Sequence, residues 1–346
     1  MPLPKLFYVC VNNGSDTRVN KEIKTLSAHF EIYYLGIGRS DENAFVKPLC
    51  AQFELVDGQP KQIFTMLRYV LRFIKLFFKF RFDRIHVVNE QLLIILLPLL
   101  WFKKSKIVAD IFDSIFLKTT NPIVKALQKL VYELPERIIV TDENRKTLVP
   151  AAFQHKLVVV ENYPYRFLDV QSKASANDEL LILYSGSLGV TRGTNLLAEL
   201  VALSPKVTIW LVGWIYDETT RTLSQHPQAK NWGVMTQQQS MKLASQCDYI
   251  LSVYEPINDN NINASPNKIY DAIQAQTPVI INKEVKIANF VREKGLGYVT
   301  ESYYEKNPAA LIENLMKAKR TFIFDQNLQN HYTWQAIESK LIEAHQ

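Results

Sequence analysis

Short apolar segments alternate with amphipathic segments along the whole 346-residue chain. The apolar segments are rich in β-branched and aromatic residues and read LFYVCV, EIYYL, RIHVV, KIVADI, RIIVT, KLVVV, LLILYSG, VTIWLVG, DYILSV, PVIIN and GYVT. Segments with helical spacing lie between them, at Val19–Ala28, Lys61–Phe80, Pro122–Tyr132, Glu143–Val149, Thr194–Leu203, Gln237–Ser245, Pro266–Gln276 and Pro308–Lys319. Alternation of this kind is typical of parallel sheets with helices on both faces, so we expect an α/β fold.

The length of the chain favours two Rossmann-like domains over one core. The polar stretch ENYPYRFLDVQSKASAND follows the sixth apolar segment and is typical of a connection. We therefore expect a first domain at 1–165, a linker at 166–177 and a second domain at 178–329. In such folds ligands bind where strands end and helices begin, which predicts a site in a cleft between the domains.

Composition narrows the class of protein. A content of 47% hydrophobic and 21% charged residues excludes a disordered chain. Three widely spaced cysteines suggest neither a disulfide framework nor a zinc site, and favour a reducing compartment. The longest apolar run, Leu92–Phe102, is well short of the ~20 residues that span a bilayer. We therefore expect a soluble or peripheral protein.

Positive charge is concentrated in the first half of the chain. Residues 1–165 contain 23 Lys and Arg against 16 Asp and Glu, whereas the remainder contains 17 against 18. Arg68, Arg72, Lys75 and Lys79 recur at helical spacing within the aromatic-rich segment MLRYVLRFIKLFFKFRFDR. This pattern predicts either a helix that lies on an anionic membrane surface or a core helix with a solvated basic stripe. The segment carries no nucleic-acid fold signature, so we expect no nucleic-acid partner.

Two loops of the second half are suited to anion binding. In YSGSLGVTRGTNLL, Gly186, Ser187 and Arg192 precede a helix, which is the arrangement of a diphosphate cradle, although a simple turn has the same composition. In NASPNKIYDAIQAQ, we expect Ser265 to cap a helix that starts at Pro266.

Further contacts to a nucleotide are expected from the same half. Asn267 and Lys268 lie at that helix start, where Lys268 is placed to contact phosphate, and Asp271 follows one turn later, where it can accept from a ribose hydroxyl. In NWGVM, Gly233 and Met235 can present backbone groups to a planar base. A surface Lys–Asp pair and a plain turn are the alternatives for these two segments.

The first half offers a loop and two candidate bases. Gly14, in NNGSDTRV, permits close backbone approach after the first strand. Asp110 and Asp113 in VADIFDS lie at a strand end, where either could serve as a general base or as a helix cap. The chain has no Asp-x-Asp motif, and NDNN at Asn258–Asn261 is the nearest sequence. We therefore expect no metal and no cofactor.

Taken in order, these segments resemble the GT-B glycosyltransferases, in particular glycosyltransferase family four and its bacterial polysaccharide relatives. The resemblance covers nearly the whole chain, including SDTRVNKEIKTLSAHFEIYYL, ERIIVTDENRKTLV, LYSGSLGVTRGTNLL and SPNKIYDAIQAQTPVI. HYTWQAIESKLIEAH is similar to that family's terminal helix, which implies that residues 330–346 cross back to the first domain. The family fold has two Rossmann-like domains that face a central cleft.

The resemblance implies a role for several residues. It places Arg192 on the donor diphosphate, Asp271 on the ribose, Gly233 to Met235 on the base and Gly14 over the phosphates. Two departures stand out. Ser187 occupies a position where many members have Arg, and Asn263 with Asp271 replaces the family's paired glutamates. The loss of Glu at 263 leaves both the donor-sugar contacts and the retaining outcome open, and Lys268 is expected to supply the missing charge.

The expected activity is metal-independent glycosyl transfer from a nucleotide-sugar donor to a lipid-linked or polysaccharide acceptor. The resemblance and the basic segment together imply a cytoplasmic enzyme, peripheral on the inner face of the cytoplasmic membrane, in bacterial capsule, O-antigen or exopolysaccharide synthesis. The alternatives are a nucleotide-sugar epimerase of the same fold and a non-catalytic sugar-nucleotide-binding subunit. The sequence leaves the sugar, the base, the acceptor and the stereochemistry open.

Overall fold

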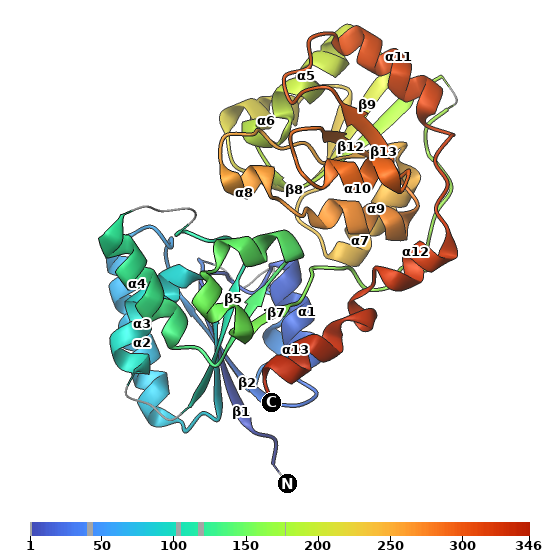
Figure 1. Cartoon of the computed structure of the whole chain (residues 1–346). Coiled ribbons are helices and arrows are strands. Elements are labelled where there is room, and N and C mark those ends of the chain that lie inside the picture. The colour runs from blue at the N-terminus through green and yellow to red at the C-terminus, as the bar shows by residue number, and fades with distance from the viewer. Residues whose placement is uncertain (1, 40–43, 102–104, 117–120, 177) are drawn as a thin grey trace. The chain divides into compact units, whose positions relative to one another are not determined.

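The computed structural model describes residues 2–39, 44–101, 105–116, 121–176 and 178–346 (Figure 1). The chain divides into two compact units. The first domain consists of Met1–Asn162 together with the C-terminal segment Ile337–Gln346, and the second domain consists of Tyr163–Ala336. The segment at the end of the chain that belongs to the first domain starts at Ile337, later than the 330–346 that the resemblance implies.

The first domain is built on a parallel seven-stranded sheet with the order β3-β2-β1-β4-β5-β6-β7. Its strands are β1 (Lys5–Val9), β2 (Glu31–Ile37), β3 (Gln52–Val56), β4 (Arg84–Val88), β5 (Lys106–Ile111), β6 (Arg137–Val140) and β7 (Leu157–Val159). Its helices are α1 (Thr17–Leu26), α2 (Ile63–Lys79), α3 (Glu90–Leu100), α4 (Pro122–Glu133) and the C-terminal α13 (Glu338–Ala344).

The two faces of this sheet have different partners. Helices α2, α3 and α4 lie together in Figure 1, and Phe73, Leu92 and Val131 from them pack in one core with Phe7 and Ile85 of the sheet. Successive side chains of a strand point to opposite faces. The neighbours of Phe7 and Ile85 on β1 and β4 therefore face α1 and α13, which contact each other.

The second domain repeats the architecture with a parallel six-stranded sheet of order β10-β9-β8-β11-β12-β13. Its strands are β8 (Leu180–Leu188), β9 (Val207–Ile215), β10 (Ala229–Asn231), β11 (Tyr249–Leu251), β12 (Val279–Asn282) and β13 (Gly297–Thr300). Its helices are α5 (Thr194–Leu203), α6 (Glu218–Leu223), α7 (Gln237–Gln246), α8 (Asp259–Ile262), α9 (Asn267–Ala275), α10 (Ala288–Glu293), α11 (Pro308–Ala318) and α12 (Gln326–His331). The predicted α/β class with two Rossmann-like domains is confirmed.

Several local features differ from the sequence-based expectation. The edge strands β3 and β10 were not anticipated, and Glu143–Leu148 forms 3-10 turns where an α-helix was expected. The expected linker 166–177 belongs to the second domain, because Lys173 Nζ donates to Cys247 O and Thr277 Oγ1, at 2.7 and 2.8 Å. Its backbone is also held, since the Ala174 N–H donates to Gln246 O at 2.8 Å.

Candidate functional site

Three glycines bring the backbone together at the carboxyl ends of the second-domain strands. Gly213 of β9 has φ +137°, and a Cβ there would lie 2.0 Å from Gly186 O. The Gly213 N–H donates to Gly233 O at 2.9 Å, which ties the turn after β10 to the same place. A Cβ on Gly186 would meet Lys268 Cε at 3.8 Å. Gly186 and Gly233 therefore both lie next to Gly213, near the carboxyl ends of β8, β9 and β10.

Lys268 lies at the N-terminus of α9 in a buried position. The helix starts after Pro266, and its first N–H groups have no side-chain cap. Burial, the nearby Arg192 cation and, in the opposite sense, Asp271 set the pKa of Lys268, which is lowered to about 7. Its Nζ lies 5.5 Å from the centre of the Tyr184 ring.

Arg192 is held by uncharged partners. Its guanidinium carbon lies 3.9 Å from the centre of the Tyr254 ring, and its Nη1 donates to Asn261 Oδ1 at 3.2 Å. Gly193, with φ +101°, follows it, and the next helix, α5, also starts without a side-chain cap. The two cations lie close enough for Arg192 to lower the pKa of Lys268, and each belongs to a segment that leads into a helix without a side-chain cap. A diphosphate has the charge and the acceptor oxygens that this arrangement fits.

The predicted cap of α9 is wrong in one detail. Pro266 itself is the N-cap residue, and Asn267 is the first residue of the helix. The Ser265 hydroxyl instead lies 3.2 Å from the Tyr270 hydroxyl. The backbone N–H groups at the start of α9 therefore donate to no capping side chain.

The other predicted donor-site residues surround this region. Ser187 is exposed in β8, opposite Trp214 of β9, and Met235 is half-buried just before α7. Asp271, on α9, accepts at Oδ1 from Gln237 Nε2 at 2.7 Å. Gln237 was not anticipated from the sequence, since it is 34 positions from Asp271 and no local pattern links them.

In the first domain, the Gly14 loop is already hydrogen-bonded within itself. Gly14 has φ +89°, and a Cβ there would lie 2.9 Å from Val46 Cγ2, so the loop does require glycine. Asn12 Oδ1 accepts from the N–H groups of Gly14 and Asp16 at 2.7 and 3.2 Å. Asp16 caps α1. A phosphate bound by this loop would have to displace the Asn12 amide, so its predicted role stays a prediction.

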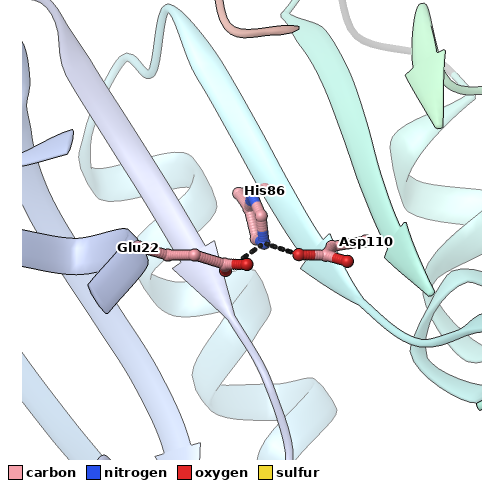
Figure 2. Close-up of side chains that lie close together, drawn as sticks. All are labelled: Glu22, His86 and Asp110. Carbon is pink, nitrogen blue, oxygen red and sulfur yellow. Dashed lines mark ion pairs between the residues drawn. The ribbon is translucent and has the colours of Figure 1, made fainter. Parts of the chain in front are cut away.

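Asp110 lies in a buried charge network at the centre of the first domain (Figure 2). Its carboxylate accepts from Arg18 Nε and Nη2 at distances of 3.0 to 3.2 Å, and Glu22 Oε1 lies 2.7 Å from Arg18 Nε. All three side chains are at most 1% exposed. One guanidinium faces two carboxylates, so burial together with Asp110 raises the pKa of Glu22 well above its usual value.

His86 completes this network and connects it to the end of the chain. Its Nε2 lies 3.5 Å from Glu22 Oε2 and 3.9 Å from Asp110 Oδ2. On the other side, His86 Nδ1 lies 3.0 Å from Nε2 of His345, which follows α13. Burial holds the pKa of His86 well below its usual value and lowers that of His345 to about 4. Glu22, His86 and Asp110 are close enough to ligate a metal, but both carboxylates are already paired with the Arg18 guanidinium.

The two predicted bases therefore differ in access. Asp110 is fully buried and paired with Arg18 on two nitrogens. The Asp113 side chain is 68% exposed, and its Oδ1 lies 3.0 Å from Arg145 Nη2. Of the two, Asp113 is the one that is open to solvent.

Helix α2 carries the predicted basic residues on its solvent side. Arg68, Arg72, Lys75 and Lys79 are all exposed, although Arg72 Nε lies 3.1 Å from Glu54 Oε2. The same side also exposes large apolar side chains, each 54% to 75% accessible: Ile63, Phe64, Leu67, Leu71 and Phe78. The opposite side of the helix is buried in the core through Tyr69, Phe73, Leu76 and Phe77. The solvent side of α2 is therefore a mixed surface of cations and large apolar side chains, and not a stripe of cations alone.

No helix in the described part of the chain is long and apolar enough to cross a membrane.

Comparisons with known proteins bear on the fold. No family model matches this sequence, and no curated protein matches it. Solved structures do match. That of Anabaena HepE in complex with UDP and glucose has a TM-score of 0.70 at 15% identity, over 98% of both chains. Sucrose-phosphate synthase from Thermosynechococcus elongatus has a TM-score of 0.71 at 14% identity, again over 98% of both chains.

A third similar structure is the UDP-N-acetylglucosamine 2-epimerase from Rickettsia bellii. Its TM-score is 0.63 at 10% identity, over 99% of this chain and 96% of that chain. The chain has the GT-B fold. At these identities the likeness shows the fold alone, and both glycosyltransferases and epimerases are among its neighbours.

Proposed function

We propose that this protein is a glycosyltransferase that binds a nucleotide-sugar donor in its second domain and transfers the sugar without a metal. The observation that carries the proposal is a pair of neighbouring cations, the buried Lys268 and the half-buried Arg192, at the uncapped starts of α9 and α5. A leaving diphosphate gains negative charge as the glycosidic bond breaks, and preorganised cations and N–H groups stabilise that charge.

Two further features of the second domain support the proposal. Asp271 lies one helical turn beyond Lys268 and suits a ribose, and the Gly233–Met235 turn suits a base. Since HepE was solved with UDP and glucose and has the same fold, a UDP-sugar is the first donor to test. We propose that the first domain binds the acceptor, with Asp113 as the base if the reaction inverts.

Calorimetry with Arg192→Ala tests the donor site. We expect the variant to bind UDP at least tenfold more weakly than the parent, because a charge-assisted contact contributes roughly 1.5 to 3 kcal/mol. Arg221→Ala, an exposed arginine of α6 in the same domain, is the matched control and should bind normally. Equal affinity in the Arg192 and Arg221 variants would remove the donor-site assignment.

The finer proposal concerns location and acceptor. We propose that α2 holds the enzyme on the inner face of the cytoplasmic membrane, where a lipid-linked or polysaccharide acceptor of bacterial surface glycan synthesis would be found. Exposed apolar side chains beside cations suit an anionic interface, to which each cation adds roughly 1 kcal/mol.

Liposome sedimentation tests the membrane proposal. Replacement of Arg68, Arg72, Lys75 and Lys79 with Gln should release the protein from vesicles that contain phosphatidylglycerol. A control removes the same number of exposed lysines from the second domain, at Lys286, Lys294, Lys306 and Lys317. If both variants sediment like the parent, α2 is not a membrane contact.

The second candidate function is an epimerase that acts on the nucleotide sugar itself. It is favoured by the several UDP-N-acetylglucosamine 2-epimerases among the structural neighbours. Incubation of UDP-N-acetylglucosamine with the protein alone separates the two activities. An isomeric nucleotide sugar, or a free sugar inverted at C2, would support the epimerase, whereas UDP with free N-acetylglucosamine, the products of transfer to water, would support glycosyl transfer.

A further inference from the structure

The contact between Gln237 and Asp271 joins two elements of the proposed donor site. Gln237 is the first residue of α7, directly after the turn that contains Gly233 and Met235, whereas Asp271 lies in the middle of α9. The Gln237 amide donates from Nε2 to Asp271 Oδ1 at 2.7 Å. The two helices pack against each other, so this hydrogen bond spans their interface.

The backbone around Gln237 is fixed. Thr236 caps α7 in a capping box with Gln239, in which the Thr236 N–H donates to Gln239 Oε1 at 3.0 Å. Gly233, three residues earlier, is tied to β9 by its carbonyl, which accepts from Gly213 N. The Gln237 side chain therefore projects from a rigid start of helix, and its amide imposes an orientation on the Asp271 carboxylate.

Orientation of a carboxylate matters for a cis-diol. A ribose presents its 2′ and 3′ hydroxyls side by side, and a carboxylate accepts from both only when its plane faces the diol. A donor amide on Oδ1 limits rotation of the carboxylate and uses one of the acceptor positions of that oxygen.

We propose that Gln237 is a positioning residue for ribonucleotide recognition: it orients Asp271 toward the 2′ and 3′ hydroxyls and couples the base-contacting turn to the ribose. This inference rests on the proposed function, since it assumes that a nucleoside diphosphate occupies the second-domain site. The ligand class that it specifies is a ribonucleoside diphosphate, in preference to its 2′-deoxy counterpart.

The test compares ribose with deoxyribose. Calorimetry measures binding of UDP, ADP and GDP and of their 2′-deoxy counterparts to the full chain, to Gln237→Leu and to the control Gln238→Ala, which changes the exposed neighbour on the same turn. In Gln237→Leu we expect affinity for the ribonucleotide to fall roughly three- to tenfold, as for loss of one hydrogen bond, with the deoxynucleotide affected less than twofold. Gln238→Ala should bind both as the parent does.

A second variant tests the role of Gln237 through the pH dependence of nucleotide affinity, which would not change if Gln237 only stabilised the fold. Gln237→Glu places a carboxylate within 2.7 Å of Asp271, where the pair must share a proton. Relative to the parent at each pH, its affinity for the ribonucleotide should fall as the pH rises, because loss of the shared proton removes the donor to Asp271.

The outcomes separate the two proposals. Equal loss of ribonucleotide and deoxynucleotide binding in Gln237→Leu, or no loss of either, overturns the role of Gln237 and leaves the proposed function intact. If the parent protein binds none of the nucleoside diphosphates, the proposed function fails, and this inference fails with it.

Discussion

Binding of a nucleotide sugar should depend on pH through Lys268. In the ligand-free protein, burial and the cation of Arg192 lower the pKa of Lys268 to about 7. A bound diphosphate supplies the missing negative charge and raises that pKa. Affinity should therefore be highest below pH 7, where Lys268 is already protonated, and should fall as the pH rises through 7, because the ligand must then recruit a proton.

The size of the effect follows from the shift. Each unit of pKa difference corresponds to about 1.36 kcal/mol, so two units of pH above the pKa of the empty site weaken binding about a hundredfold. The expected change in affinity between pH 6 and pH 9 is thus close to two orders of magnitude. A nucleotide sugar is the right probe, because both phosphates of its diphosphate are esterified and carry no proton to lose in this range.

Calorimetry in buffers of different ionisation enthalpy measures the proton directly. The parent should take up nearly one proton per bound UDP-sugar at pH 8 and almost none at pH 6. Lys268→Met keeps the length and the apolar packing of the side chain, and it should bind weakly at every pH without proton uptake. A flat affinity from pH 6 to 9 in the parent would refute the argument, and so would undiminished proton uptake in Lys268→Met.

Two further predictions concern the first domain. The pKa of an unfolded histidine is about 6.5, whereas that of His345 in the folded protein is about 4, so the unfolded state binds more protons between these two values. His345 should therefore lower the free energy of unfolding by about 2 kcal/mol between pH 7 and pH 5. Urea unfolding of His345→Gln should lack this part of the loss, and the same pH dependence of the unfolding free energy in variant and parent would contradict the prediction. If transfer inverts with Asp113 as the base, Asp113→Asn should lower turnover about a hundredfold or more at unchanged UDP-sugar affinity, and full turnover would leave the departing phosphate to accept the proton.

Much of the fold was predictable because the hydrophobic pattern of a parallel α/β protein is strong. Buried strands such as β8 and β12 read as continuous apolar runs bounded by turn residues. The edge strands β3 and β10 escaped notice because their side chains are mostly half-buried or exposed, so burial leaves little mark on their sequence. The hydrophobic pattern of a sequence identifies strands that are buried in a core, but not strands that only pair at the edge of a sheet.

The candidate site was predictable only in part. Gly186, Arg192 and Lys268 were visible because glycines and cations at helix starts have a local meaning. The residues that contact them come from distant parts of the chain: the Tyr254 ring lies against the Arg192 guanidinium, and Gly213 lies beside Gly186. Such contacts have no signature at short range.

The base candidates show the same limit. Asp110 and Asp113 look alike in VADIFDS, three positions apart at a strand end. What separates them is the Arg18 guanidinium, 92 positions from Asp110, which pairs with Asp110 in the buried network. Access to solvent is a property of the folded chain, and no spacing within the segment encodes it.

The central claim is that Lys268 and Arg192 together bind the diphosphate of a nucleotide sugar. A crystal structure of the protein with a bound UDP-sugar tests it most directly. We predict diphosphate oxygens within ion-pairing distance of Lys268 Nζ and of the Arg192 guanidinium, at the N-terminus of α9. A diphosphate bound away from both side chains would contradict the account.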